Sequence, residues 1–592
     1  MQCEVMVMAV GRIRARAVAV ILSISVFFLA MSAAAYPAEH DRSIDRHLSQ
    51  GTDALAAGDL PTAIQHYEKC LALDPNQRYC CVNLASALVD VNDAETDDAV
   101  AQRRATQAVA LLRRVLAQHP ADGDAAFNLG ILLQDSSRAE ESTREAADLY
   151  QIAVEAADAD GGGGNWDALA NMAAARQELG EFLGQYGALR SYSRATVLLE
   201  GVAEEHDATL DRMLSDSGAA EREYDDKVYR ETQAQLTQVN AYLSKLYYGY
   251  GTILSELPPS DCLTFVKGSS LFVGDGNEGK DEMLAKTVCD SKALTSMQRA
   301  VDLDGNNAVA IHMLAAMTGG EDSGRASNEF VTSLFDDFAE TFDEKLGALG
   351  YKVPKLVGEA AFDQLQSVDK DTFRSALDAG CGTGLAGRYL RPLVGGPLVG
   401  VDLSTKMLEL AAQCTLLAGC GAEKKEATDG GDIEKDERAR TPLYDALLSL
   451  DLETATVDEL MPRGSSDGFD LVVAADVLVY FGSLSTLLTN FRRLSHKGDD
   501  EKSFLIFSCE RLDNDTASSA GWQLQSSGRY AHSKAYVTNV AESAGFDLLG
   551  YEEIVPRMER GKEVKGHLFV FATGGSIEEH VHVDMKTVME EL

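Results

Sequence analysis

Along the first half of the chain, apolar residues return with the period of an amphipathic helix, and one spaced set of positions recurs. From about residue 44 to 317 the sequence is rich in alanine, and the clearest copy of the recurring set is Ala63, Tyr67, Cys70 and Pro75. A pattern that repeats at fixed spacing is typical of stacked helical units, because each unit buries its apolar face against its neighbours. The pattern therefore predicts an all-helical array over residues 44–317.

Looser copies follow the first one along the chain. Their core positions are Ala108, Leu112, Val115 and Pro120; Ala146, Tyr150 and Ala153; and Ala293, Met297, Ala300 and Gly305. The small residues that come ten positions after a loop residue are Ala85, Gly130 and Ala315. Small side chains let antiparallel helices approach closely, while larger ones fill the grooves between helix pairs. The pattern resembles tetratricopeptide repeats, which implies a concave surface for a protein or peptide partner; a plain helical bundle is the alternative.

From residue 370 onward the pattern changes to alternating strand and helix signals. Residues 375–379 form a short apolar run that enters a glycine-rich turn, residues 385–394 have a helical pattern, and residues 397–403 form a second apolar run. Alternation of this kind is typical of βαβ units around a parallel sheet. The predicted fold class is therefore an all-α tetratricopeptide-like solenoid followed by an α/β Rossmann-like domain over residues 326–575.

Length and charge narrow the functional classes. The chain has 592 residues, with 53 Lys+Arg against 93 Asp+Glu, which gives a formal net charge of −40. Its length indicates more than one domain, and 45% hydrophobic residues argue against wholesale disorder. A surface this negative repels phosphate backbones and anionic lipid headgroups. We therefore expect no nucleic-acid partner.

The first 35 residues have the character of a targeting segment. A basic patch at residues 11–16 precedes the apolar run Ala17–Ala35, which ends in small residues. A basic region, an apolar core and a small-residue exit are typical of a secretory signal peptide, so we expect a cleaved signal and a secreted or lumenal protein. The run is also long enough for an uncleaved single-pass anchor, and a plastid-type presequence is a third alternative.

The cysteines fit an oxidising compartment only in part. The chain has 10 cysteines and no C-x-x-C, so zinc-ribbon and thioredoxin-type sites are excluded. Cys262 and Cys289 flank a glycine-rich stretch and are a candidate disulfide pair for an oxidising lumen. The favoured interpretation of four others is that of small buried hydrophobes; these are Cys70, Cys80, Cys81 and Cys381.

Candidate chemistry begins at the glycines after the first predicted strand. Gly380, Gly382 and Gly384 follow that strand, and Asp402 closes the next one. Glycine lets the backbone approach a ligand closely, and an acid at the next strand end can accept both hydroxyls of a ribose. A dinucleotide site needs G-x-G-x-x-G, which Gly382, Gly384 and Gly387 match formally. That match is out of register, because the first glycine after the strand is Gly380.

The run LDAGCGTG followed by Asp402 resembles the class I S-adenosylmethionine-dependent methyltransferases. The resemblance implies S-adenosyl-L-methionine as the cofactor, with Met407 packed on its adenine and Asp451 near the adenine amino group. The full set of cofactor contacts that it implies is Asp378, Gly380, Cys381, Gly382, Gly384, Asp402, Leu403, Met407, Asp451 and Leu452. Four further segments resemble a group of predicted methyltransferases that carry N-terminal tetratricopeptide repeats: 334–354, 528–537, 543–550 and 557–571.

The acceptor site is expected on the loop after the fourth predicted strand and on a segment that folds over it. Asp476 and Tyr480 lie on that loop, and Arg529, Tyr530 and His532 lie in a polar stretch that we predict to act as a lid. His532 is the expected base, because an unperturbed imidazole titrates near neutral pH. The alternative is that Tyr480 packs in the core while Arg529 and His532 pair with nearby carboxylates.

Three functions remain compatible with the sequence. The first is a methyltransferase for an unidentified small-molecule acceptor, the second is a protein methyltransferase whose repeats hold the substrate chain, and the third is a noncatalytic scaffold. An N-P-P-Y-type motif is missing, because the loop reads Ala475-Asp476-Val477-Leu478. The signature motifs of serine hydrolases, zincins and P-loop proteins are missing too, and methyl transfer needs no metal.

Two segments depart from a compact domain. Residues 421–440 are highly charged with both signs and are predicted to be a disordered insertion. The tail, residues 576–592, contains His580 and His582. A metal site there would lack an identifiable third ligand, so a solvated tail is the favoured interpretation and no metal is expected.

Overall fold

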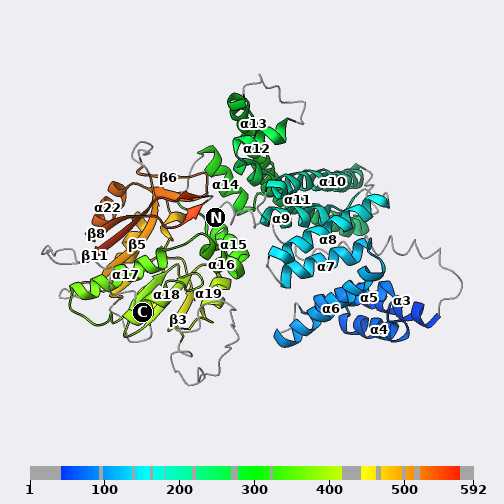
Figure 1. The fold of residues 1–592 in the computed structure, drawn as a ribbon, viewed down its shortest axis with the longest axis horizontal. Coiled ribbons are helices and arrows are strands. Elements are labelled where there is room, and N and C mark those ends of the chain that lie inside the picture. The colour runs from blue at the N-terminus through cyan, green and yellow to red at the C-terminus, as the bar shows by residue number, and fades with distance from the viewer. Residues whose placement is uncertain are drawn as a thin grey trace. The chain divides into compact units, whose positions relative to one another are not determined.

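The computed structural model describes two compact units of the chain, Gln2–Leu314 and Ala315–Leu592 (Figure 1). The described residues are 42–92, 98–136, 140–160, 164–179, 182–215, 222–267, 278–319, 324–415, 442–461, 468–496, 502–512, 520–559 and 561–573. The predicted signal segment, the charged insertion 421–440 and the tail with His580 and His582 lie outside these residues. Among the described helices, none combines the length and the apolar character needed to cross a membrane.

The first unit is built from helices that pack against their neighbours in sequence. They are α3 (Arg42–Ala56), α4 (Leu60–Leu73), α5 (Arg78–Asn92), α6 (Asp98–Gln118), α7 (Gly123–Ser136), α8 (Glu140–Ala159), α9 (Trp166–Glu178), α10 (Phe182–Ser215), α11 (Arg222–Glu256), α12 (Pro259–Val266) and α13 (Glu278–Leu303). Helix α14 (Ala308–Thr318) spans the boundary between the units. The all-helical prediction for this region is confirmed, and its assignment to tetratricopeptide repeats stays a prediction.

The recurring small residues are buried at the contacts between helices. Ala63, Ala108, Ala146 and Ala293 are all 0% exposed. A Cβ added to Gly51 would lie 2.6 Å from the Tyr67 ring, and one added to Gly130 would lie 2.7 Å from the Tyr150 ring. The spacing seen in the sequence therefore has a packing cause, because an aromatic ring of one helix rests against the backbone of another.

We expect Gly130→Ala to destabilise the helical unit by about 1–3 kcal/mol, because the new methyl group overlaps a buried tyrosine ring. Gly201→Ala is the matched control, since Gly201 also lies inside a helix and a Cβ there meets nothing within 4 Å. The control should gain up to about 1 kcal/mol from helix propensity. Urea unfolding followed by the helical circular dichroism signal measures both. Equal midpoints for the two variants would contradict this account of the packing.

Two cysteine predictions need correction. Cys70 and Cys80 form a disulfide rather than serving as buried hydrophobes. The antiparallel turn between α4 and α5 brings them together. Cys262 and Cys289, which were considered as a pair, are free buried thiols that share a hydrogen bond. Cys81 and Cys381 are buried free cysteines, as expected.

The second unit contains a mixed sheet in the order β3-β2-β1-β4-β5-β11-β8. Its strands are β1 (Ala376–Ala379), β2 (Leu398–Asp402), β3 (Ala446–Ser449), β4 (Leu471–Ala474), β5 (Phe504–Arg511), β8 (Asp547–Ile554) and β11 (Gly566–Ala572). The first five are parallel, and β11 runs antiparallel to both β5 and β8. The short strands β6 (Trp522–Leu524) and β7 (Tyr530–His532) extend from β5. The predicted parallel α/β core is confirmed.

Buried apolar side chains form one core on each face of this sheet. Helices α17 (Val353–Ser367), α18 (Gly387–Leu390) and α19 (Thr405–Ala411) contribute to one core, while α21 (Ser485–Leu494) and α22 (Lys534–Ser543) contribute to the other. The helix predicted over 385–394 is shorter than expected, because it ends at Leu390 and Pro392 lies in a separate 3₁₀ turn, Arg391–Leu393. The strand order reverses at β1, which lies between β2 and β4, and ligands of such sheets bind outside the strand ends at that point.

Candidate functional site

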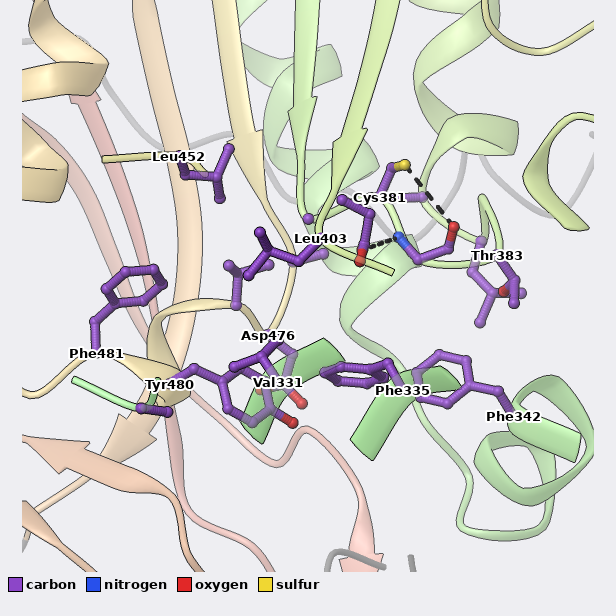
Figure 2. Close-up of a pocket in the computed structure, with 18 of the residues that line it drawn as sticks. Val331, Phe335, Phe342, Cys381, Thr383, Leu403, Leu452, Asp476, Tyr480 and Phe481 are labelled. Carbon is purple, nitrogen blue, oxygen red and sulfur yellow. Dashed lines mark hydrogen bonds between the residues drawn. The ribbon is translucent and has the colours of Figure 1, made fainter. Parts of the chain in front are cut away.

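A pocket lies at the carboxyl ends of β1, β2 and β4, where the strand order reverses (Figure 2). It encloses about 1040 Å³ of space outside atoms, part of it open to solvent. In Figure 2, Leu452, Leu403, Cys381 and Thr383 lie on one side of the pocket, opposite a row formed by Phe481, Tyr480, Asp476, Val331, Phe335 and Phe342. Of the predicted site residues, those that line the pocket are Gly380, Cys381, Gly382, Asp402, Leu403, Asp451, Leu452, Asp476, Tyr480 and Arg529.

The glycine loop after β1 has a backbone that other residues rarely adopt. Gly380, Gly382 and Gly384 have φ angles of +73°, +54° and +92°. A Cβ on Gly380 would lie 2.4 Å from the Val477 side chain, whereas one on Gly382 would meet only Phe342, at 3.8 Å. The loop therefore passes close to the post-β4 loop at Gly380 and leaves open space at Gly382.

Asp402 ties the end of β2 to this loop. The Gly382 N–H donates to its Oδ2 over 2.9 Å, and the Ser404 N–H donates to its Oδ1 over 3.0 Å. Burial raises the pKa of Asp402, and these N–H donors oppose the rise. The predicted acid at the second strand end thus lines the pocket and also fixes the glycine loop.

Asp378 and Met407 lie behind the pocket rather than in its wall. Asp378 is fully buried and accepts a hydrogen bond from the Tyr444 hydroxyl over 2.7 Å. Burial raises its pKa to about 7, and its Oδ1 has no hydrogen-bond partner. Met407 is also fully buried, at the start of α19, and Gly384 lies beside the Tyr444 ring. These three residues support the lining residues instead of forming the pocket surface.

Asp451 has a cationic neighbour that the sequence analysis missed. Arg325 pairs with Asp451 over 3.1 Å and with Glu453, while Asn328 donates to Asp451 over 3.0 Å. Although burial raises the pKa of Asp451, these contacts and the Glu453 N–H lower it overall. The Arg325 guanidinium also lies 4.9 Å from the centre of the Phe481 ring.

Arg325 is held at the pocket by the backbone around it. The Ala326 N–H donates to the Tyr480 carbonyl, and the Gly482 and Ser483 N–H groups donate to the Gly324 carbonyl, each over 2.8 Å. Residues 324–326 therefore belong to the second unit, which includes residues before 326. An isolated arginine in a Gly-Ser-rich stretch carried no motif that would have revealed this role.

An aromatic wall faces the glycine loop. Phe335, in α15 (Asn328–Phe338), makes edge-to-face contacts with Tyr480 at 5.5 Å and with Phe342 at 5.8 Å between ring centroids. Phe342 begins α16 (Phe342–Ala348), and Tyr351 follows that helix. The rings of Phe335, Phe342, Tyr351 and Tyr480 all line the pocket. The first three come from residues 326–354, so this segment covers the pocket on the side away from the strand ends.

Asp476 leaves β4 in a strained conformation, with a φ angle of 61°. Its N–H donates to the Ser508 hydroxyl over 2.8 Å, and its Oδ2 accepts from Arg557 over 2.9 Å. Burial raises the pKa of Asp476, and Arg557 opposes that rise. Its Oδ1 is buried without a hydrogen-bond partner.

Asp476 belongs to a buried ionic cluster of five charged residues. Its members are Asp476, Glu510, Arg529, Arg557 and Glu559. The Arg557 side chain is 0% exposed and contacts all three carboxylates. Arg529 contacts Glu510 over 2.8 Å and Glu559 over 3.0 Å. The predicted Arg529 is therefore at the pocket, but its two carboxylate contacts hold it as part of a network.

The predictions for His532 and Tyr530 are wrong. Both lie in β7, which pairs with β5, so the polar stretch is part of the sheet rather than a lid. The His532 Nε2 donates to the Phe481 carbonyl over 2.8 Å, and neither residue lines the pocket. Burial lowers the pKa of His532 to about 4, despite bonds to backbone carbonyls that raise it. His532 is therefore a neutral structural group and no base.

We expect the His532 ring signals in an NMR titration to show no transition between pH 5.5 and 8. The reason is that the charged imidazolium would be buried, and only two backbone carbonyls would stabilise its charge. The resonance is assigned by its loss in His532→Gln. A midpoint near pH 6.5 would contradict the buried placement.

Among the described residues, no group of three or more His, Cys, Asp or Glu side chains is arranged to hold a metal ion. The polar groups that line the pocket are instead carboxylates, arginines and backbone groups of the glycine loop. An organic ligand that carries hydroxyl and amino donors suits this set.

A comparison with family models finds a match for part of the chain. Residues 377–498, which run from within β1 to just beyond α21, match a family model described as a methyltransferase domain. No curated protein matches the chain. Similar solved structures include a putative S-adenosylmethionine-dependent methyltransferase from Listeria monocytogenes, with 16% identity, 36% of this chain and 98% of that chain covered, and a TM-score of 0.23.

Two other solved structures have a comparable identity, coverage and TM-score. An S-adenosylmethionine-dependent methyltransferase from Clostridium acetobutylicum is 16% identical, with 41% of this chain and 99% of that chain covered and a TM-score of 0.26. A 1,6-didemethyltoxoflavin-N1-methyltransferase from Burkholderia thailandensis is 12% identical, with 43% of this chain and 94% of that chain covered and a TM-score of 0.28. The site described above lies around the matched segment, and over residues 377–498 this chain is similar to the methyltransferase domain family.

Proposed function

We propose that this chain is an S-adenosylmethionine-dependent methyltransferase that acts on a small molecule. The observation that carries the proposal is the joint placement of the glycine loop and Asp402 at one pocket, within a segment that matches a methyltransferase domain. The alternative dinucleotide cofactor is disfavoured by the register of the glycines, since Gly380 is the first glycine of the loop.

The lining residues fit this cofactor. Gly382 leaves open space above the loop, where the methionine part would lie. Asp402 has lone pairs beyond those used by Gly382 and Ser404, and it would accept the ribose hydroxyls. Leu403, Leu452 and Phe481 would enclose the adenine, with Asp451 and Arg325 at its polar edge. When bound, the cofactor supplies an electrophilic methyl group.

The protein's own contribution is positioning and the exclusion of water. Phe335, Phe342 and Tyr480 cover the pocket with apolar ring surface. Holding two reactants in line in such a pocket accounts for a large part of the rate of a displacement reaction. Asp476 and Tyr480 are the groups we assign to the acceptor end, and His532 has no part in it.

The cover formed by residues 326–354 favours a small acceptor over a protein chain, because rings from α15 and α16 close the side away from the strands. Tritiated methyl transfer into a cell lysate tests this point. We expect the label to run with small molecules. Label in protein would favour a protein methyltransferase whose repeats recruit the substrate, and an absence of transfer would favour a noncatalytic scaffold.

The helical unit and the N-terminus complete the proposal. We propose that the repeats bind a protein or peptide partner, and that the apolar run Ala17–Ala35 directs the chain into the secretory pathway as a cleaved signal. The N-terminal sequence of protein recovered from the medium of a secreting cell checks the second point. An intact N-terminus in the membrane fraction would favour a single-pass anchor.

A further inference from the structure

We infer that the methyl acceptor is an amine, bound as an ammonium between the Asp476 carboxylate and the rings of Phe335 and Tyr480. This inference rests on the proposed function and adds the chemical class of the acceptor. It concerns the end of the pocket beyond the glycine loop, which the cofactor assignment leaves without a ligand.

The first observation is an unsatisfied acceptor atom. Asp476 lines the pocket, and its Oδ1 is buried with no hydrogen-bond partner, while its Oδ2 is paired with Arg557. A buried carboxylate oxygen without a donor costs free energy, so a ligand group that donates a hydrogen bond to Asp476 stabilises the site. The ligand group that satisfies such an oxygen is a hydrogen-bond donor, and a charged N–H donor does so most strongly.

The second observation is the charge around this oxygen. The ionic cluster contains the carboxylates of Asp476, Glu510 and Glu559 and two guanidinium groups, so these five groups offer an anion no surplus of positive charge. Arg557 forms ion pairs with all three carboxylates, and Arg529 forms ion pairs with Glu510 and Glu559. The chain as a whole has a formal net charge of −40, which attracts cations and repels anions.

The competing acceptor is an anion held by Arg529, whose Nε is buried without a partner. Two carboxylates already face Arg529, so an incoming carboxylate or phosphate would meet repulsion from Glu510 and Glu559. An amine that also carries a neutral oxygen atom would satisfy both Arg529 and Asp476. An anionic acceptor would leave the Asp476 oxygen unpaired.

The third observation is the aromatic wall. Phe335 and Tyr480 lie in the same row as Asp476 in Figure 2, with Phe342 beside Phe335. Ring faces attract cations through their quadrupole, and they do so more strongly where water is excluded. A carboxylate and aromatic rings that line one pocket are the combination that recognises an alkylammonium group.

The transfer balances with these groups alone. The ammonium gives one proton to the Asp476 carboxylate, and the freed nitrogen lone pair forms the new N–C bond. The C–S bond of the sulfonium breaks, and its electron pair stays on sulfur, which becomes a neutral thioether. The proton leaves Asp476 to solvent as the methylated amine departs. Burial raises the pKa of Asp476, which makes it a better proton acceptor than an exposed carboxylate.

The test compares three probes of one shape: benzylamine, benzyl alcohol and benzoate. Each is titrated by calorimetry into the full chain saturated with S-adenosylhomocysteine. We expect benzylamine to bind at least tenfold more tightly than either of the others. Asp476→Asn should remove this preference, because the isosteric amide has no charge and suits the positive φ angle. Asp458→Asn, at an exposed position, is the control and should keep it.

A second pair of variants guards against a folding artefact. Tyr480→Leu should weaken benzylamine about fivefold and benzyl alcohol less than twofold, whereas Tyr480→Phe, which keeps the ring, should retain the preference for benzylamine over benzyl alcohol. Benzylamine that binds no better than benzyl alcohol, or tighter binding of benzoate, would overturn the inference. A chain that does not bind S-adenosylhomocysteine would instead contradict the proposed function on which the inference rests.

Discussion

Replacing Asp402 with alanine is expected to weaken S-adenosylmethionine binding by about 2 kcal/mol or more, which is roughly a 30-fold rise in Kd. The ribose hydroxyls lose a charged acceptor, and the Gly382 and Ser404 N–H groups lose the oxygens that fix the glycine loop. Because the loop is held through Asp402, part of the loss is a loss of preorganisation. Calorimetric titration of the full chain measures the change.

Asp445→Ala is the matched control for this variant. Asp445 accepts from the Leu398 N–H over 2.8 Å, at the opposite end of β2 from Asp402. It therefore removes a similar side-chain-to-backbone bond from the same strand without touching the pocket, and the Kd should stay within about twofold. An Asp402→Ala protein with parental affinity would mean that the acid at the second strand end does not contact the cofactor.

Replacing Arg557 with methionine is expected to destabilise the second unit by about 3–5 kcal/mol at pH 8, because three carboxylates then lose a buried partner. Arg511→Met is the control, since Arg511 pairs with Glu553, whose side chain is 62% exposed. An exposed pair contributes about 1 kcal/mol or less. Urea unfolding of both variants, followed by near-ultraviolet signals, gives the comparison.

The pH dependence of the Arg557 variant has a definite sign. Burial raises the pKa of Glu510 to about 7, above its ordinary value near 4.3, although Arg557 lowers it. Between these values the folded state binds more protons than the unfolded state, so this group's contribution to stability falls as pH rises. Without Arg557 the pKa of Glu510 rises further. The stability lost in Arg557→Met should therefore be smaller at pH 5.5 than at pH 8. A loss that is equal at both pH values would contradict a buried ionic cluster.

The parts of the site that follow a strand were predictable from the sequence. The glycine loop, Asp402 and Asp476 each come directly after a short apolar run, and the parallel sheet brings those strand ends to one edge. Asp378 and Met407 were predicted in the correct strand and helix. They lie behind the pocket wall, however, because their side chains face the core. A residue's place in a motif fixes its element, whereas its orientation depends on packing.

The rest depended on pairings between distant segments. His532 looked exposed in a polar stretch, yet β7 pairs with β5 and buries it. The ionic cluster unites the loop after β4, strand β5, the residue before β7 and the segment at β9 (Met558–Glu559), and no local spacing reveals it. Arg325 reaches the pocket only because its backbone joins the loop after β4. The Cys70–Cys80 disulfide likewise depends on the turn between two helices.

Calorimetric titration of the full chain with S-adenosylmethionine, and separately with NAD, tests the central claim most directly. The placement of Asp402 and the glycine loop at a single pocket predicts saturable binding of one S-adenosylmethionine per chain and no heat from NAD. Binding of NAD together with an absence of heat from S-adenosylmethionine would contradict the assignment of this pocket to a methyltransferase cofactor.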